Sequence, residues 1–148
     1  MDKKEIALIS ACLMGFNCRY NCKNSLTQYL DVFLKKYYLI PVCPEQLGGL
    51  PTPRERSEIT KGDGFYVING YSRVITSKGI DVSDNFLKGA HEILSFAKNF
   101  NIKIAYFKDK SPSCGVNNIY INGTLTNGVG VTTALLLDNN IEVLWVKS

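Results

Sequence analysis

Three cysteines of this 148-residue chain each follow a short apolar segment of strand length. They are Cys12 after residues 6–10, Cys43 after residues 38–42, and Cys114 in the loop after residues 102–107. In an open parallel sheet the carboxyl ends of the strands meet at one edge, and ligands bind there. We therefore expect these three thiols to converge, although a buried cysteine is also an ordinary small apolar core residue.

Three converging thiolates offer two kinds of metal chemistry. A [4Fe–4S] cluster held by three cysteines leaves one iron open to a substrate atom. A zinc ion held by three cysteines leaves one position for water. The cysteine spacing, which contains neither a C-x2-C pair nor a ferredoxin-like run, favours neither. Cys18 and Cys22, in the polar loop 17–24, offer with Cys12 a local zinc site as a further alternative.

Polar and glycine residues that could act on a bound ligand accompany the second and third cysteines. Glu45 lies two residues after Cys43, on a segment stiffened by prolines on both sides of that cysteine, and could serve as an acid or base. The other candidates, for contacts to a ligand, are Arg54, Ser111, Ser113 and the turn formed by Gly48 and Gly49. Each residue also has an ordinary structural explanation. A charged side chain can simply be solvated, and the serines and glycines can simply form turns.

Composition indicates one globular domain over residues 1–148, with 45% hydrophobic and 20% charged residues. The net charge of +4 is scattered, with no Lys/Arg run longer than two residues, so we expect small polar or anionic ligands rather than nucleic acid. No apolar segment approaches the roughly 18–20 residues of a membrane span. The amino terminus lacks the pattern of a signal peptide, so we expect a cytoplasmic protein with reduced cysteines.

Hydrophobic periodicity predicts an α/β fold, a Rossmann-like open sandwich with a mostly parallel four-stranded sheet. The predicted strand order across the sheet is 38–42, 6–10, 102–107 and 141–146. The predicted helices are 26–37 capped by Ser25, 84–99 capped by Ser83, and 131–137. Two Asn-Gly pairs predict hairpins, 65–75 within an inserted segment of about 60–77, and 119–125.

Five motifs together resemble a short bacterial family that includes thiouracil desulfurases. They are Ser10-Ala-Cys-Leu13, Asn17-Cys-Arg-Tyr20, Pro41-Val-Cys-Pro-Glu45, Gly48-Gly-Leu-Pro-Thr-Pro-Arg54 and Ser111-Pro-Ser-Cys-Gly115. The resemblance covers residues 5 to about 145. One departure is Cys22, which stands where the family motif has glycine.

The resemblance implies a [4Fe–4S] cluster held by Cys12, Cys43 and Cys114, and catalytic roles for Glu45 and Ser111. It also implies an enzyme that removes sulfur from a thiolated pyrimidine without net redox change. Since a cluster with an open iron is prone to oxidation, we expect it to be lost from protein prepared in air.

Two other functions are compatible with the residues alone. One is a non-catalytic module that binds metal or sulfur through the same cysteines. The other is a zinc-bound or metal-free nucleotide-binding domain, which is disfavoured because the first strand is followed by Ser10-Ala-Cys-Leu-Met-Gly15 rather than Gly-x-Gly-x-x-Gly.

Overall fold

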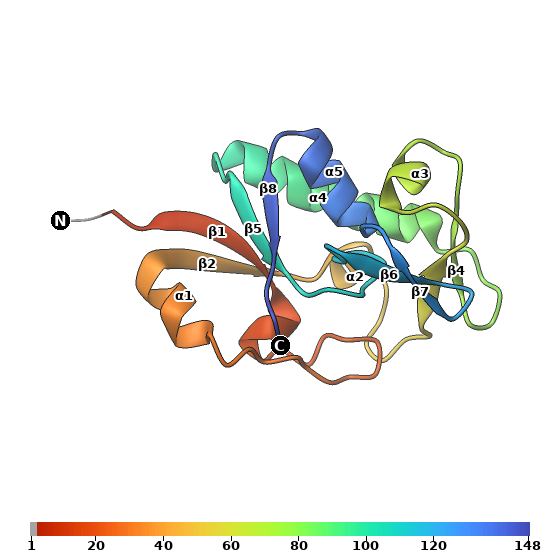
Figure 1. Cartoon of the computed structure of the whole chain (residues 1–148), viewed down its shortest axis with the longest axis horizontal. Helices are drawn as coiled ribbons and strands as arrows, with labels where there is room; N and C mark the ends of the chain where they lie inside the picture. The colour runs from red at the N-terminus through yellow and green to blue at the C-terminus, as the bar shows by residue number, and fades with distance from the viewer. Residues whose placement is uncertain (1–2) are drawn as a thin grey trace.

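Four apolar segments form a parallel sheet at the centre of the molecule (Figure 1), in a computed structural model that describes residues 3–148. Across the sheet the strands are β2 (Tyr37–Val42), β1 (Glu5–Ser10), β5 (Ile104–Phe107) and β8 (Glu142–Trp145). All neighbouring pairs are parallel. The predicted class and strand order are confirmed.

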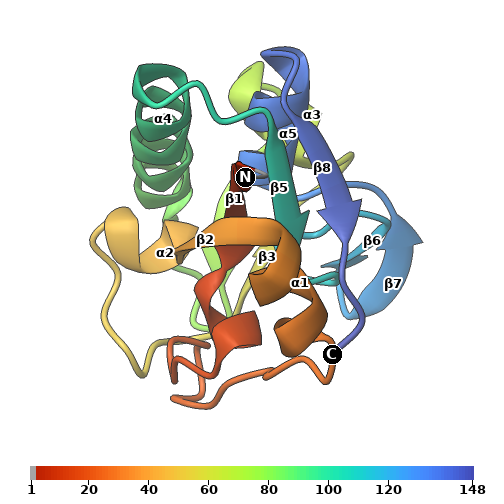
Figure 2. The same ribbon diagram turned by 90° about the vertical axis from the view of Figure 1, so that its left-hand side faces the viewer.

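Helices cover both faces of this sheet (Figures 1 and 2). The covering elements are α4 (Ser83–Asn99) and α5 (Val131–Asp138) on one face, and the 3-10 turn η1 (Ala11–Met14) and α1 (Leu30–Lys36) on the other. Leu8 of β1 packs with Phe86 of α4 in one core cluster, whereas Ile9 packs with Leu13 in the other. Burial on both faces explains why this strand is continuously apolar.

Two predicted helix starts are wrong. Helix α1 begins at Leu30 rather than at 26, and Ser25 does not cap it. The reason is that Ser25 and Thr27 hydrogen-bond through their backbone N–H groups to carbonyls of η1, which holds this segment outside the helix. Ser83 is the first residue of α4 rather than its cap, and its Oγ accepts a hydrogen bond from the backbone N–H of Val74.

The predicted hairpin at 65–75 is also wrong. Phe65 to Ile68 belong to helix α3 (Gly64–Ile68), where Asp63 caps the helix by accepting from the N–H of Phe65. The cap and the packing of α3 against α5 therefore override the β propensity of the sequence Phe-Tyr-Val-Ile. The antiparallel pair in this region is β3 (Ser57–Ile59) with β4 (Val74–Thr76), which lies on either side of α3 in the sequence.

The second predicted hairpin is confirmed as β6 (Asn118–Ile121) and β7 (Thr124–Asn127). Its turn residues Asn122 and Gly123 both have positive φ, 49° and 76°, as a type I′ turn requires. No helix within residues 3–148 is long and apolar enough to cross a membrane.

Candidate active site

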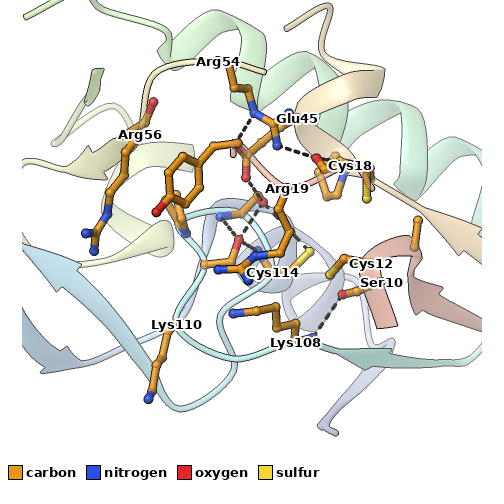
Figure 3. A pocket seen from close by; sticks show the side chains of 18 of the residues that line it. Ser10, Cys12, Cys18, Arg19, Glu45, Arg54, Arg56, Lys108, Lys110 and Cys114 are labelled. Carbon is orange, nitrogen blue, oxygen red and sulfur yellow. Dashed lines mark hydrogen bonds and ion pairs between the residues drawn. The ribbon is translucent and has the colours of Figure 1, made fainter. Parts of the chain in front are cut away.

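A cavity of about 270 Å³ opens at the carboxyl ends of β1, β2 and β5 (Figure 3). One side is lined by the residues that directly follow these three strands. The opposite side comes from the segment that leads into β3 and from β6. These two strands belong to the two small antiparallel sheets. The cavity therefore lies at the sheet edge that the strand-end rule indicates.

Four of the five cysteines line this cavity: Cys12, Cys18, Cys43 and Cys114. Cys43 is partly buried and the other three are buried, whereas Cys22 is exposed and lies outside the lining. The structure therefore brings the three strand-end thiols together. Cys22 is exposed outside the cavity while Cys18 is buried within it, and no metal-binding group of three such side chains occurs in residues 3–148, which argues against the local zinc site that their spacing suggested.

The cavity thiols lie in one lining and are largely shielded from water. Hydrogen bonding to Cys18, together with burial, raises the pKa of Cys43 far above its usual range. Hydrogen bonding to Cys12 raises the pKa of Cys18 to about 11, and burial raises the pKa of Cys114. Without a bound metal these thiols keep their protons at neutral pH, so binding a metal or cluster must displace those protons.

Glu45 is held at the cavity wall by two different segments of the chain. Helix α2 (Pro44–Leu47) starts directly after Cys43, which places the side chain of Glu45 beside the cysteines with 13% of it exposed. Its Oε1 accepts from Arg54 Nε at 3.0 Å, and its Oε2 accepts from Ser113 Oγ at 2.9 Å. The carboxylate is therefore fixed in orientation and links the loops that follow β2 and β5.

Arg54 uses its guanidinium entirely within the protein. Besides Glu45, it donates through Nη1 to Thr52 Oγ1 at 3.0 Å and through Nη2 to the carbonyl of Cys18 at 2.9 Å. Only 6% of its side chain is exposed. Arg54 lines the cavity beside Glu45, and its guanidinium supports both the carboxylate and the Cys18 loop.

Two serines extend the hydrogen bonding of Glu45 along the cavity. Ser111 Oγ lies 3.0 Å from Ser113 Oγ and accepts from the backbone N–H of Cys114 at 3.0 Å. A serine hydroxyl has a single proton. Because Ser113 donates that proton to Glu45, it accepts from Ser111. The result is a directed chain of hydrogen bonds from Ser111 through Ser113 to Glu45.

The predicted ligand contacts of Gly48 and Gly49 have no counterpart in the cavity lining. Gly48 instead lies against α4, where its carbonyl accepts from Asn85 Nδ2 at 2.9 Å. A Cβ at Gly48 would collide with the backbone carbonyl of Asn85, and one at Gly89 would collide with that of Pro44. Glycine at both positions lets α2 approach α4 closely, which positions Glu45 indirectly.

Sequence reasoning missed a set of cationic and aromatic side chains in the cavity wall. They are Arg56, Lys108, Lys110, Tyr20 and Tyr120, and Arg19 of the Asn17–Tyr20 motif lines the cavity beside them. Lys108 directly follows β5, so the strand-end rule could have found it, and its pKa is lowered by burial and by nearby Arg19. Arg56 lies 4.5 Å from the ring centroid of Tyr120, a pairing that depends on the placement of β6 and that no sequence spacing indicates.

The arrangement of the sulfur donors distinguishes a single metal ion from a cluster. Within residues 3–148, no three His, Cys, Asp or Glu side chains are gathered closely enough to hold one metal ion. A zinc ion needs its sulfur ligands at about 2.3 Å from one point. A [4Fe–4S] cluster instead distributes its thiolates over separate irons. Thiols that line one cavity without meeting at a point are compatible with such a cluster rather than with a single ion.

Together these features define a Rossmann-like α/β protein with a thiol-lined cavity at the carboxyl edge of its sheet. The sequence profile of the 2-thiouracil desulfurase family matches residues 7–147, and the chain belongs to that family. The resemblance drawn from the five motifs is thereby confirmed.

Two relatives show how far the similarity extends. The chain is 39% identical over 141 residues to the uncharacterized protein YbbK of Bacillus subtilis (strain 168), with 93% of each chain covered. It also superimposes on the solved structure of the [4Fe-4S]-dependent thiouracil desulfidase TudS with a TM-score of 0.82 and 35% identity. That match covers 97% of this chain and 91% of the other.

Proposed function

We propose that this protein is a [4Fe–4S]-dependent desulfurase that converts a thiolated pyrimidine to the corresponding oxo-pyrimidine. The observation that carries the proposal is the convergence of Cys12, Cys43 and Cys114 on one cavity beside the chain from Ser111 to Glu45. Membership of the 2-thiouracil desulfurase family and the likeness to TudS support it.

The reaction replaces a C=S bond with a C=O bond. Water and the thiocarbonyl are consumed, and the oxo-pyrimidine and hydrogen sulfide are formed, so no electrons are gained or lost. When bound, the cluster supplies a thiophilic Lewis acid for the substrate sulfur, which otherwise leaves poorly.

The protein side chains supply the proton transfers. Glu45, oriented by Arg54 and Ser113, takes the proton of the water that attacks the ring carbon. The hydroxyls of Ser111 and Ser113 then carry protons between the carboxylate and the pyrimidine ring, because each can donate one hydrogen bond while accepting another. The mostly buried position of Glu45 limits competition from bulk water.

Cluster content tests the cofactor assignment directly. After anaerobic reconstitution we expect about four iron and four sulfide per wild-type chain, and a large loss of both in Cys43→Ala. Cys22→Ala is the matched control, because Cys22 is exposed and outside the cavity. Zinc in place of iron, or equal iron in all three proteins, would refute the assignment.

Turnover tests the activity itself. Reconstituted wild-type protein is expected to release uracil and sulfide from 2-thiouracil or its nucleotide, measured by chromatography and by a sulfide assay. A fully loaded protein that converts neither compound would instead indicate a non-catalytic module that binds the cluster.

The charge of the cavity wall favours a substrate that carries an anionic group. Five cationic side chains line the cavity: Arg19, Arg54, Arg56, Lys108 and Lys110. Glu45 is the one acidic side chain in the lining as the structure describes it, and its charge is already balanced by Arg54. The other four cations therefore give the cavity a positive potential, which attracts anions such as a nucleotide phosphate.

A comparison of neutral and phosphorylated substrates tests this charge argument. We expect a KM roughly tenfold lower for a thiouridine 5′-monophosphate than for 2-thiouracil, about 1.4 kcal/mol of binding. Arg56→Gln should raise the KM of the monophosphate but not that of the base, whereas Lys88→Gln, on the exposed side of α4, should change neither. Equal KM values for both substrates in wild-type protein would contradict the argument.

A further inference from the structure

Cys18 is the cavity thiol to which neither the cluster assignment nor the proposed proton transfers give a role. Its residue is only 5% exposed, so its thiol is not a chance feature of the surface. Its side chain lines the same cavity as the thiols of Cys12 and Cys43. The thiol of Cys43 in turn donates to the backbone carbonyl of Cys18, with Sγ and O 3.8 Å apart.

The backbone around Cys18 is held in place from two sides. Its carbonyl accepts from Arg54 Nη2 at 2.9 Å, which ties it to the wall behind Glu45. The next residue, Arg19, closes a tight turn by donating from its N–H to the carbonyl of Lys23 and accepting from the N–H of Cys22. Cys18 is therefore presented to Cys43 by a fixed loop.

From this arrangement we propose that Cys18 forms a reversible disulfide with Cys43 whenever no cluster is bound. Cys43 is the partner because it is only partly buried, whereas Cys12 and Cys114 are buried, so a small oxidant in the cavity reaches Cys43 first. Cys18 then lies within reach to resolve the oxidised Cys43, because Cys43 Sγ already lies 3.8 Å from the Cys18 carbonyl oxygen and both residues line one cavity.

The oxidant is a small disulfide such as oxidised glutathione. The small thiolate fraction of Cys43 attacks it and forms a mixed disulfide, and the glutathione thiolate that leaves takes up the proton that Cys43 lost. Cys18 then attacks the Cys43 sulfur of that mixed disulfide, which forms the Cys18–Cys43 bond and releases the second glutathione thiol. Two protein thiols are oxidised and one small disulfide is reduced to two thiols, so atoms and electrons balance.

The bond has two consequences for the site. It removes one of the three proposed cluster ligands, so the oxidised chain accepts no cluster until the disulfide is reduced. It also shields Cys43 from sulfinic and sulfonic acids, which cannot be reduced back by thiols. The Cys18–Cys43 disulfide therefore protects the cluster site from irreversible oxidation while no cluster is bound.

The test uses full-length protein that has been reduced, stripped of metal and incubated anaerobically with oxidised glutathione. Non-reducing peptide mass spectrometry is expected to find residues 5–19 cross-linked to the peptide that contains Cys43, with fragment ions that assign the bond to Cys18 rather than Cys12. In Cys18→Ser the glutathione adduct should persist on Cys43. Cys22→Ser should behave as wild type.

A lasting glutathione adduct on wild-type Cys43, or a bond from Cys18 to Cys12, would overturn the proposal. Iron loading provides a second measurement, since the oxidised wild type should load poorly and regain full loading after reduction. The mass spectrum is recorded on metal-free protein without substrate. A failure of the disulfide is therefore distinguishable from a failure of the proposed desulfurase function, and either can occur alone.

Discussion

Replacing Glu45 with glutamine is expected to lower turnover of a thiolated pyrimidine by about 10²–10⁴-fold, the usual contribution of a general base. Glutamine keeps the length of the side chain and can still accept a hydrogen bond through its amide oxygen, but it cannot take a proton from water at neutral pH. The loss should appear in kcat, measured as oxo-pyrimidine formed by the anaerobically reconstituted protein.

Iron and sulfide content decide how such a loss is interpreted. Glu45 is not one of the proposed cluster ligands, so Glu45→Gln should load as much iron as wild type and show the same visible spectrum. Glu92→Gln, on the exposed face of α4, is the matched control and should keep full activity. Wild-type turnover in Glu45→Gln would remove this residue from the mechanism.

The sequence predicts the cysteine edge of the site because that edge follows from topology alone. Cys12, Cys43 and Cys114 each come directly after a strand or in its exit loop, and parallel strands deliver their exits to one side. Ser111 and Ser113 share the exit loop of Cys114, so they reach the same cavity. No long-range information beyond strand order is needed for these positions.

The opposite wall is not predictable in this way. Arg56 and Tyr120 reach the cavity because β3 lies against β6, and these strands belong to two separate small sheets. The segment between β3 and β4 contains helix α3 where the sequence predicts a hairpin. Asp63 caps this helix, which forms although its residues have strand propensity. Local patterns could therefore not have placed this wall.

The sequence predicts that Arg54 lies near the site, but it does not indicate that Arg54 supports Glu45 and the Cys18 loop. Its motif indicates a polar residue near the site, and a ligand contact is a reasonable expectation for an arginine after Gly48 and Gly49. Burial and the four internal acceptors of the guanidinium show that it also supports the surrounding loops. That assignment depends on the path of residues 51–54, which periodicity does not reveal.

Arg54→Ala is expected to combine a large loss of turnover with a loss of stability. Removing the guanidinium leaves the carboxylate of Glu45 mostly buried without its ionic partner, a change that typically costs about 3–5 kcal/mol of unfolding free energy. Glu45 also loses one of its two fixed hydrogen bonds, so kcat should fall by about 10²-fold through misorientation of the base. Denaturant unfolding and steady-state kinetics measure the two effects separately.

Two variants separate orientation from general damage to the fold. Arg73→Ala removes an arginine whose pair with Asp81 is largely exposed, so it should cost at most about 1 kcal/mol and leave kcat unchanged. Arg54→Lys keeps the charge but cannot reach Glu45, Thr52 and the Cys18 carbonyl together, because an ammonium lacks the planar fork of a guanidinium. It should recover most of the stability and little of the turnover. Recovery of both would mean that Arg54 acts through its charge alone, and that the placement of Glu45 does not depend on its bonds to the Cys18 loop.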